Sequence, residues 1–441
     1  MSDLRRFFFS LFDRLADSLQ AGECLLCNFL GEQSDFVRLN GNKVRQAGQV
    51  RQFELALNLI SDHRSAKAMT HVTGLIEADA EHGFRIIASL RDQIDSIPQD
   101  PYLWINRNVE NSESIGLNQL EPATRTIEEI LASSGQLDLV GLYASGPICR
   151  GFANSFGQRN WYVRSSFNFE WSCFLENNQA VKSRYAGFVW DLAEFERKTK
   201  RIKQSIELIT RPEKSISPGR YRVFLAPAAV QELLSTVAWQ GFGAKGHRTG
   251  QSSLFKLARG IERLNSAVCL IENNQSGLAP DFTRTGFIKP SRVDLILQGT
   301  HAGMLVNSRS AKEYGLTVNA DSEYPASLEM AAGALDDNDV LKSLNTGLYI
   351  SNLWYCNYSD QNECRITGMT RYACFWVENG KIRAPINPMR FDESLYRVLG
   401  SNLLAIAREQ EWILSSDTYL RRSVSSMRIP GLLIDDFSFT L

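Results

Sequence analysis

The chain has 441 residues, of which 44% are hydrophobic and 22% are charged, a composition typical of a globular protein and not of a disordered one. This length exceeds one ordinary hydrophobic core, so we expect two domains. The 48 basic and 49 acidic side chains leave a net charge of −1, which gives no electrostatic reason to expect nucleic acid or an acidic membrane as a partner.

The N-terminal 20 residues predict an amphipathic helix instead of a secretion signal. Arg5 and Arg6 precede an apolar run, but Asp13 and Arg14 interrupt that run too early for a signal peptide or a membrane span. No later segment approaches the ~18 consecutive apolar residues that a spanning helix needs. We therefore expect a cytoplasmic protein.

Eight cysteines are scattered along the chain. Without a secretory signal, reduced thiols are expected. Cys24 and Cys27 form a C-x-x-C pair, which could be half of a zinc or redox site, but zinc would need two further ligands and the sequence has no second C-x-x-C or H-x-H pair. The favoured interpretation is that both thiols pack on the buried face of a helix.

The first half of the chain predicts a mixture of strands and helices. Residues 35–48 predict a hairpin with Asn40-Gly41 at its turn, because this dipeptide accepts positive φ. Alternating leucines over residues 52–60 predict a half-buried strand, and residues 63–72 could add another. Beyond these, the periodicity predicts two helices, a β-rich region and a third helix, over residues 77–97, 121–135, 137–190 and 191–209.

The helix over residues 191–209 has an apolar face that includes Phe195 and Ile202. Its other face is cationic. We expect a solvated surface formed by Arg197, Lys198, Lys200, Arg201 and Lys203.

Residues 211–220 are the predicted domain boundary, because two prolines, a glycine and two serines break both helix and strand. The fold class expected is α+β. Residues 1–215 should form an N-terminal α/β domain with a mostly antiparallel sheet, and residues 216–441 a C-terminal β-rich domain with a central helix. A second helix over residues 253–271 could follow the central one, and short strands recur from residue 281 onward.

The central helix is predicted to begin at residue 227 and to run into a Gly-rich turn. Its apolar residues recur at helical spacing and form one stripe: Val230, Leu233, Leu234, Val237 and Ala238. Such a helix can present two histidines and a glutamate to a metal ion. Here it has none of those residues at matching spacing.

The order of these parts resembles the TldD/PmbA family of peptidase-complex proteins. Each matching motif is short, and their collinearity over nearly the whole chain gives the resemblance its force. The matching segments are DFVRLNGNKVRQAGQV (35–50), ANSFGQ (153–158), SPGRYRVFLAPAAVQELL (217–234), GMLVNSRSAKEYG (303–315), TGLYISNL (346–353), ITGMTRYACFWVENGKIRAPI (366–386) and PGLLIDDFSF (430–439).

The catalytic branch of that family has an H-E-x-x-x-H motif in the central helix, directly after an apolar pair. With a cysteine near the C-terminus, its histidines bind a metal that activates water. The apolar pair here is Leu233-Leu234, so the motif positions fall on Ser235, Thr236 and Gln240. None is a good zinc ligand, and Thr236 cannot serve as a carboxylate base.

The C-terminal cysteine is missing too, since no cysteine follows Cys374. The resemblance is therefore to the PmbA (TldE-type) non-catalytic branch. It implies no catalytic and no metal-binding residue in this chain, a TldD-type catalytic subunit as partner with the zinc in that partner, and unfolded or small peptides as substrate. Arg248 and Thr249, together with the three motif positions, are possible substrate-chamber residues. Polar helix and loop residues without function are the more ordinary interpretation.

Two alternatives stay open. The first is an independent metallopeptidase with relocated ligands. The chain has five histidines, but His247 lies in a GAKGHRTG loop, where a lone histidine more often forms hydrogen bonds than binds a metal. The second is a peptide-binding module without a protease, which the aromatic residues of 352–358 and 373–380 would support. Segments 351–368 and 399–428 match the family least, so the sequence does not define which surfaces contact the substrate and the partner.

Overall fold

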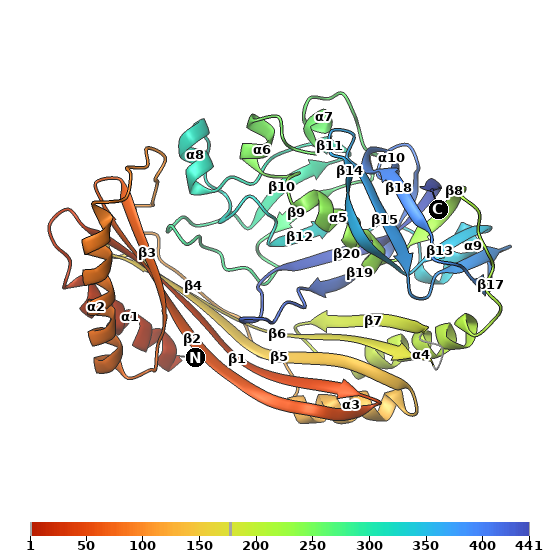
Figure 1. Ribbon diagram of the computed structural model, residues 1–441, viewed down its shortest axis with the longest axis horizontal. Helices are drawn as coiled ribbons and strands as arrows, with labels where there is room; N and C mark the ends of the chain where they lie inside the picture. Colours follow the sequence, from red (N-terminus) through yellow and green to blue (C-terminus); the bar gives the residue numbers. More distant parts are fainter. Residues whose placement is uncertain (1, 176–178, 441) are drawn as a thin grey trace.

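The computed structural model describes residues 2–175 and 179–440. Helices make up 24% and strands 42% of it, so the α+β class expected from the sequence is confirmed. Two β-sheets organise the molecule. In Figure 1 the first sheet is a long curved surface along the bottom of the view, and the second sheet with its helices lies above it.

The first sheet has seven strands in the order β3-β2-β1-β5-β6-β4, with β7 beside β6. Its pairs are antiparallel except for β4 with β6. Positive φ at Gly41 (57°) and Asn42 (53°) closes the first hairpin, one residue later than the predicted turn. The strands are β1 (Cys24–Asn40), β2 (Lys43–Ser61), β3 (Arg64–His71), β4 (Ser112–Ile115), β5 (Asp138–Asn154), β6 (Arg159–Phe174) and β7 (Ala180–Gly187).

Two pairs of helices cover the first sheet. At one end, α1 (Ser2–Ala16) and α2 (Ile76–Ile94) bury their apolar stripes in one cluster with strand residues such as Phe29 and Leu57. Further along, α3 (Ala123–Ser134) and α4 (Leu192–Ile209) join a second cluster rich in aromatic rings. The helices over residues 77–97, 121–135 and 191–209 are thus confirmed.

The second sheet has 13 strands. Nine of them are neighbours in the order β11-β10-β9-β12-β20-β8-β13-β16-β17, and β14, β15, β18 and β19 pair outside this path. Its largest buried cluster surrounds α5 and the central strands β8 and β20. The strands are β8 (Gly219–Leu225), β9 (Leu270–Asn273), β10 (Arg292–Leu297), β11 (Thr300–His301), β12 (Ser327–Met330), β13 (Gly347–Ile350), β14 (Asn352–Asp360), β15 (Arg365–Arg371), β16 (Phe375–Glu378), β17 (Lys381–Pro385), β18 (Arg390–Ser394), β19 (Leu403–Leu414) and β20 (Ser426–Phe439).

Short helices join these strands. They are α5 (Pro227–Ala238), α6 (Ala244–Arg248), α7 (Phe255–Ala258), α8 (Ser308–Tyr314), the 3-10 turn η1 (Asp337–Asp339), α9 (Val340–Leu344) and α10 (Leu395–Val398). The helix expected over residues 253–271 is wrong in extent, because only α7 forms there. Gly260 adopts a φ of +69° directly after this short helix, a conformation that ends a helix.

Two expectations about side-chain surroundings are also wrong. Cys24 and Cys27 lie on β1 and not on a helix, although both are buried as expected. Lys198 of α4 is not solvated: its side chain is 8% exposed, and its Nζ lies 2.9 Å from Glu411 Oε1 on β19. Its partner Glu411 is half-buried on a distant strand, and the helix periodicity alone could not reveal this pairing.

A connection of residues 415–425, which we name the strap, joins β19 to β20 and crosses to the first sheet (Figure 1). Arg422 of the strap is buried, and its guanidinium donates to Gly146 O at 2.9 Å and to Ser166 O at 2.8 Å. Its backbone N–H donates to the carboxylate of Glu32 at 2.9 Å. The strap therefore ties the second half of the chain to the inner strands of the first sheet.

All eight cysteines are free, in agreement with the expected reduced thiols. Within residues 2–175 and 179–440, no helix combines the length and the apolar character that crossing a membrane requires.

Candidate functional site

Helix α5 is the centre of the candidate site because it corresponds to the helix on which the resemblance places the metal motif of catalytic relatives. Strand β8 leads into it, and Pro227 occupies its first turn, where proline fits without losing a hydrogen bond. The predicted apolar stripe is confirmed, since Val230, Leu233, Leu234 and Val237 are all buried. The helix is thus anchored by one face, and its other face is left to polar residues.

That polar face opens on a cavity of about 370 Å³, which we name the α5 cleft. Gln231, Glu232 and Ser235 contribute one wall, and β6, β7 and the ends of the strap contribute the others. The charged residues of the opposite wall are Glu170, Lys182 and Arg184. Arg184 Nη1 donates to Gln231 Oε1 at 2.9 Å, so the cleft is spanned by a contact between the two halves of the chain.

The two carboxylates of the α5 cleft, Glu170 and Glu232, differ in how strongly the nearby cations stabilise their charge. Lys182 forms an ion pair with Glu170, and Arg184 lies nearby. Burial raises the pKa of Glu170, but the hydrogen bond from Lys182 and the two cationic charges outweigh that effect and lower it. Burial also raises the pKa of Glu232, and the same cations offset only part of that rise. Glu232 is therefore the cleft's carboxylate that most readily holds a proton.

The three positions that match the metal motif do not converge on one point. Ser235 Oγ accepts a hydrogen bond from Gln231 Nε2 at 2.9 Å and faces the α5 cleft. Thr236 Oγ1 donates to Glu232 O, one turn earlier in the same helix, at 2.9 Å. Gln240 lies beyond the last helical residue and accepts from Gln361 Nε2 at 2.7 Å, on the β14–β15 turn.

Gln240 and Thr249 instead line a separate cavity of about 670 Å³, between the end of α5, α6 and α8. Its walls also include Arg309, Glu313 and Glu323. Arg248 is exposed at the end of α6. The predicted chamber residues are thus dispersed: Ser235 lines the α5 cleft, Gln240 and Thr249 line this second cavity, Arg248 lies on the surface, and Thr236 lines neither cavity.

His247 lies in α6 and is not a lone histidine. Its ring packs edge-to-face against the ring of His301, with centroids 4.9 Å apart. His247 Nε2 lies 2.8 Å from Gly241 O, whereas His247 Nδ1 and His301 Nε2 are buried and without a hydrogen-bond partner among the described residues. Burial, with a smaller contribution from His301, lowers the pKa of His247 to about 4, and burial also lowers that of His301.

Two histidines are fewer than a zinc site needs. Among residues 2–175 and 179–440, no group of three or more His, Cys, Asp or Glu side chains is arranged to hold a metal ion.

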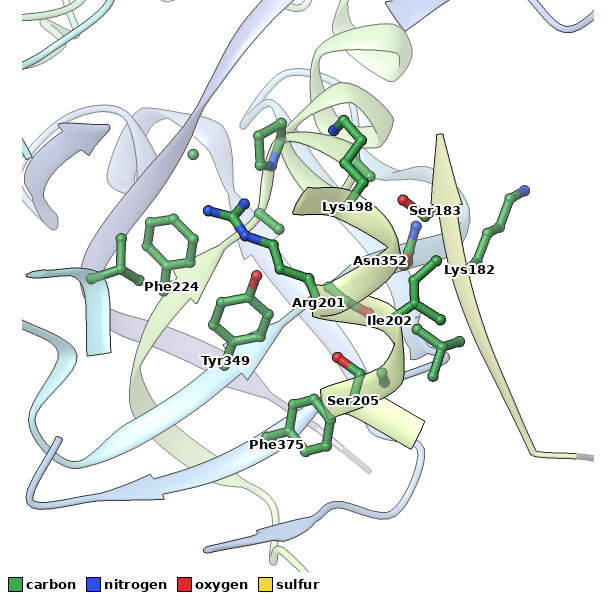
Figure 2. A pocket seen from close by; sticks show the side chains of 18 of the residues that line it. Lys182, Ser183, Lys198, Arg201, Ile202, Ser205, Phe224, Tyr349, Asn352 and Phe375 are labelled. Carbon is green, nitrogen blue, oxygen red and sulfur yellow. The ribbon is translucent and has the colours of Figure 1, made fainter. Parts of the chain in front are cut away.

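A third cavity, of about 320 Å³, adjoins the α5 cleft, since Lys182 and Arg184 line both. Figure 2 shows Arg201 extending from α4 past Tyr349 toward Phe224. Arg201 Nη2 pairs with Asp337 at 3.1 Å. The two cavities together form a charged cleft between the first sheet with α4 and the second sheet.

Sequence reasoning missed the residues that define this cleft. Glu232 could have been found, because the helical period places it three residues before Ser235 on the same face. Lys182 and Arg184 are two residues apart on β7, so the sequence indicates only that their side chains point to the same side of a strand. Nothing in the sequence indicates which helix that side faces.

The fold and the site define a two-sheet α+β protein with a central helix that opens on a charged cleft. The model of the PmbA/TldA metallopeptidase C-terminal domain matches residues 218–441. The chain therefore belongs to the PmbA/TldA metallopeptidase family, as its resemblance predicted. Among curated proteins, none matches the chain.

Solved structures share the fold over nearly the whole chain. TldE from Thermococcus kodakarensis has a TM-score of 0.75 at 14% identity and covers 100% of both chains. A proposed modulator of a DNA gyrase from Thermotoga maritima has a TM-score of 0.75 at 14% identity, over 98% of this chain and 100% of that one. A proposed modulator of DNA gyrase from Bacteroides thetaiotaomicron has a TM-score of 0.73 at 15% identity, over 99% and 98%.

Proposed function

We propose that this chain is the non-catalytic subunit of a TldD/TldE-type heterodimeric zinc metallopeptidase that cleaves unfolded or small peptides. The observation that carries the proposal is the state of α5. Where a catalytic relative would present His, Glu and His, this chain has Ser235, Thr236 and Gln240, whose polar atoms bond to protein groups in different directions. The zinc and the catalytic base belong to the partner.

The cleft around α5 supports a role in holding peptide. It combines carboxylates and cations with backbone from several strands, a setting that suits extended peptides of varied sequence. Glu232, Lys182 and Arg184 are the side chains we assign to peptide contacts there. Family membership supports only the broader proposal, that the chain works within a TldD/TldE-type peptidase.

Reconstitution tests the proposal. The chain is purified alone, and also together with a TldD-type subunit from the same source, and each sample is given a fluorogenic unfolded peptide. We expect hydrolysis only by the mixture, together with a shift to heterodimer mass in light scattering. Hydrolysis by the isolated chain at a comparable rate would contradict the proposal, and so would failure of the two chains to associate.

A relocated metal site is the second candidate, and the His247–His301 pair is the observation that favours it. Each of these two packed imidazoles has one buried nitrogen without a hydrogen-bond partner among the described residues. Replacing both histidines by asparagine distinguishes the candidates. The relocated-site hypothesis expects loss of any hydrolysis, whereas the subunit hypothesis expects the activity of the reconstituted mixture to survive.

A further inference from the structure

A fourth cavity, of about 590 Å³, lies between the first sheet and the second half of the chain, and the strap forms part of its wall. It is separate from the α5 cleft, with which it has no lining residue in common. Its volume lies in the ordinary range for small-ligand sites. Apolar residues line part of it, among them Leu30, Phe282 and Leu420.

Arg150 projects into this cavity from β5. Its pairing with Leu30 of β1 places it on the inner face of the sheet, while Cys149 beside it packs in the core on the other face. Arg150 Nη1 donates to Cys149 O at 2.8 Å and to Gly31 O at 3.4 Å. Both of these hydrogen bonds use Nη1, and within residues 2–175 and 179–440 Nε and Nη2 have no hydrogen-bond partner.

The other charges around the cavity are matched. Arg421 pairs with Glu54, and Arg284 pairs with Asp321 at 2.8 Å. Lys289 donates to Asn274, and the charge of Glu272 lies close enough to raise its pKa against the larger lowering by burial. Asp417 sits at the exposed rim, where it accepts the N–H of Tyr419 at 3.0 Å.

Arg422 is satisfied in a different way. Its two terminal nitrogens donate to Gly146 and Ser166, and the carboxylate of Glu32 lies at its backbone N–H. Among the described residues, Arg150 is thus the lining guanidinium with free donors and with no carboxylate within ion-pair distance. Burial lowers its pKa to about 10, so it still carries its charge at neutral pH.

We propose that this cavity binds the free C-terminal carboxylate of a peptide, with Arg150 as the counter-ion. The planar guanidinium matches a carboxylate in shape and charge. The free Nε and Nη2 of Arg150 can each donate to one carboxylate oxygen, which gives a bidentate contact. The apolar wall then receives the side chain of the last residue. This inference deepens the proposed peptide-holding function and rests on it.

Binding of one labelled peptide in two forms tests the inference. Fluorescein-labelled Gly-Ala-Ala-Ala-Leu is prepared with a free C-terminus and with an amidated one, and the anisotropy of each is titrated with the full chain. We expect the free acid to bind about 10-fold tighter, as a charge-assisted contact predicts. Equal affinities would overturn the carboxylate site while keeping peptide binding. Absence of binding by either form would overturn the inference together with the peptide-holding function.

A variant then assigns the effect to Arg150. Arg150→Gln should remove the preference for the free acid, whereas Arg51→Gln, which removes an exposed cation outside the cavity, should keep it. Arg150→Lys retains the charge without the fork and should give an intermediate preference. Thermal melting of each variant shows whether it folds. An unchanged preference in folded Arg150→Gln would overturn the assignment.

Discussion

The hydroxyl of Thr236 donates to the carbonyl oxygen of Glu232 at 2.9 Å, within one turn of α5. A catalytic relative would need a carboxylate at this position to take a proton from water. Here the side chain returns to its own helix, as threonines within helices commonly do. The position is thus used to complete the local structure of α5, which is what we expect of a subunit that leaves the chemistry to its partner.

The strap should be a major stabilising contact between the two halves of the chain. Arg422→Ala removes a buried guanidinium and leaves the carbonyl oxygens of Gly146 and Ser166 without their donors. We expect the free energy of unfolding to fall by about 3 kcal/mol, which is the upper end of the range for a hydrogen bond that involves a charged group. Urea denaturation measures this. Arg220→Ala, which breaks an exposed pair with Asp436, is the control and should cost less than about 1 kcal/mol.

The buried pair between α4 and β19 makes a different prediction. Lys198→Ala leaves the half-buried carboxylate of Glu411 without the ammonium group that donates to it, so we expect the free energy of unfolding in urea to fall by about 2 kcal/mol. Replacing both residues, by Met at 198 and Leu at 411, should restore most of that loss, because neither charge is then stranded. Lys200→Ala on the exposed face of α4 should have little effect. If Lys198→Ala were as mild as Lys200→Ala, the ion pair would not contribute as described.

Stability should fall in mildly acidic solution because of His247. Its folded pKa of about 4 lies below the ordinary value of 6.5, so the unfolded chain binds the proton first. The contribution of this histidine is complete above pH 6.5 and is lost as the pH falls toward 4, by about 3 kcal/mol in total. Urea midpoints across this range measure it.

His247→Asn should flatten that dependence, while His63→Asn, at an exposed position on the other half of the chain, should not. An equally steep loss of stability in His247→Asn would show that other groups cause it.

Much of the fold could be predicted, because the burial of strands and helices leaves a period in the sequence. Phe167, Phe169 and Trp171 alternate on β6 and are all buried, and the stripe on α5 is equally plain. For the site, the sequence predicted only the absence of the metal motif. Ser235, Thr236 and Gln240 show that no metal motif is present, but the charges that define the cleft come from β7, whose facing helix is set by the packing of two sheets.

Long-range partners explain the remaining differences. His247 meets His301 across 54 positions of sequence, and Lys198 meets Glu411 across 213. No pattern of neighbouring residues predicts either pair, since each of the four residues resembles an ordinary polar residue of its own segment. Such contacts follow from the topology of the second sheet and its docking on the first, which short-range patterns do not determine.

The central claim is that this chain contains no catalytic zinc site, and metal content tests it most directly. The chain is purified alone, supplemented with zinc, desalted and measured by mass spectrometry of the metal. We predict less than about 0.1 zinc per chain, since a three-ligand site is the minimum for a catalytic zinc. One zinc per chain would contradict the account, and its loss in His247→Asn would place the metal at the His247–His301 pair.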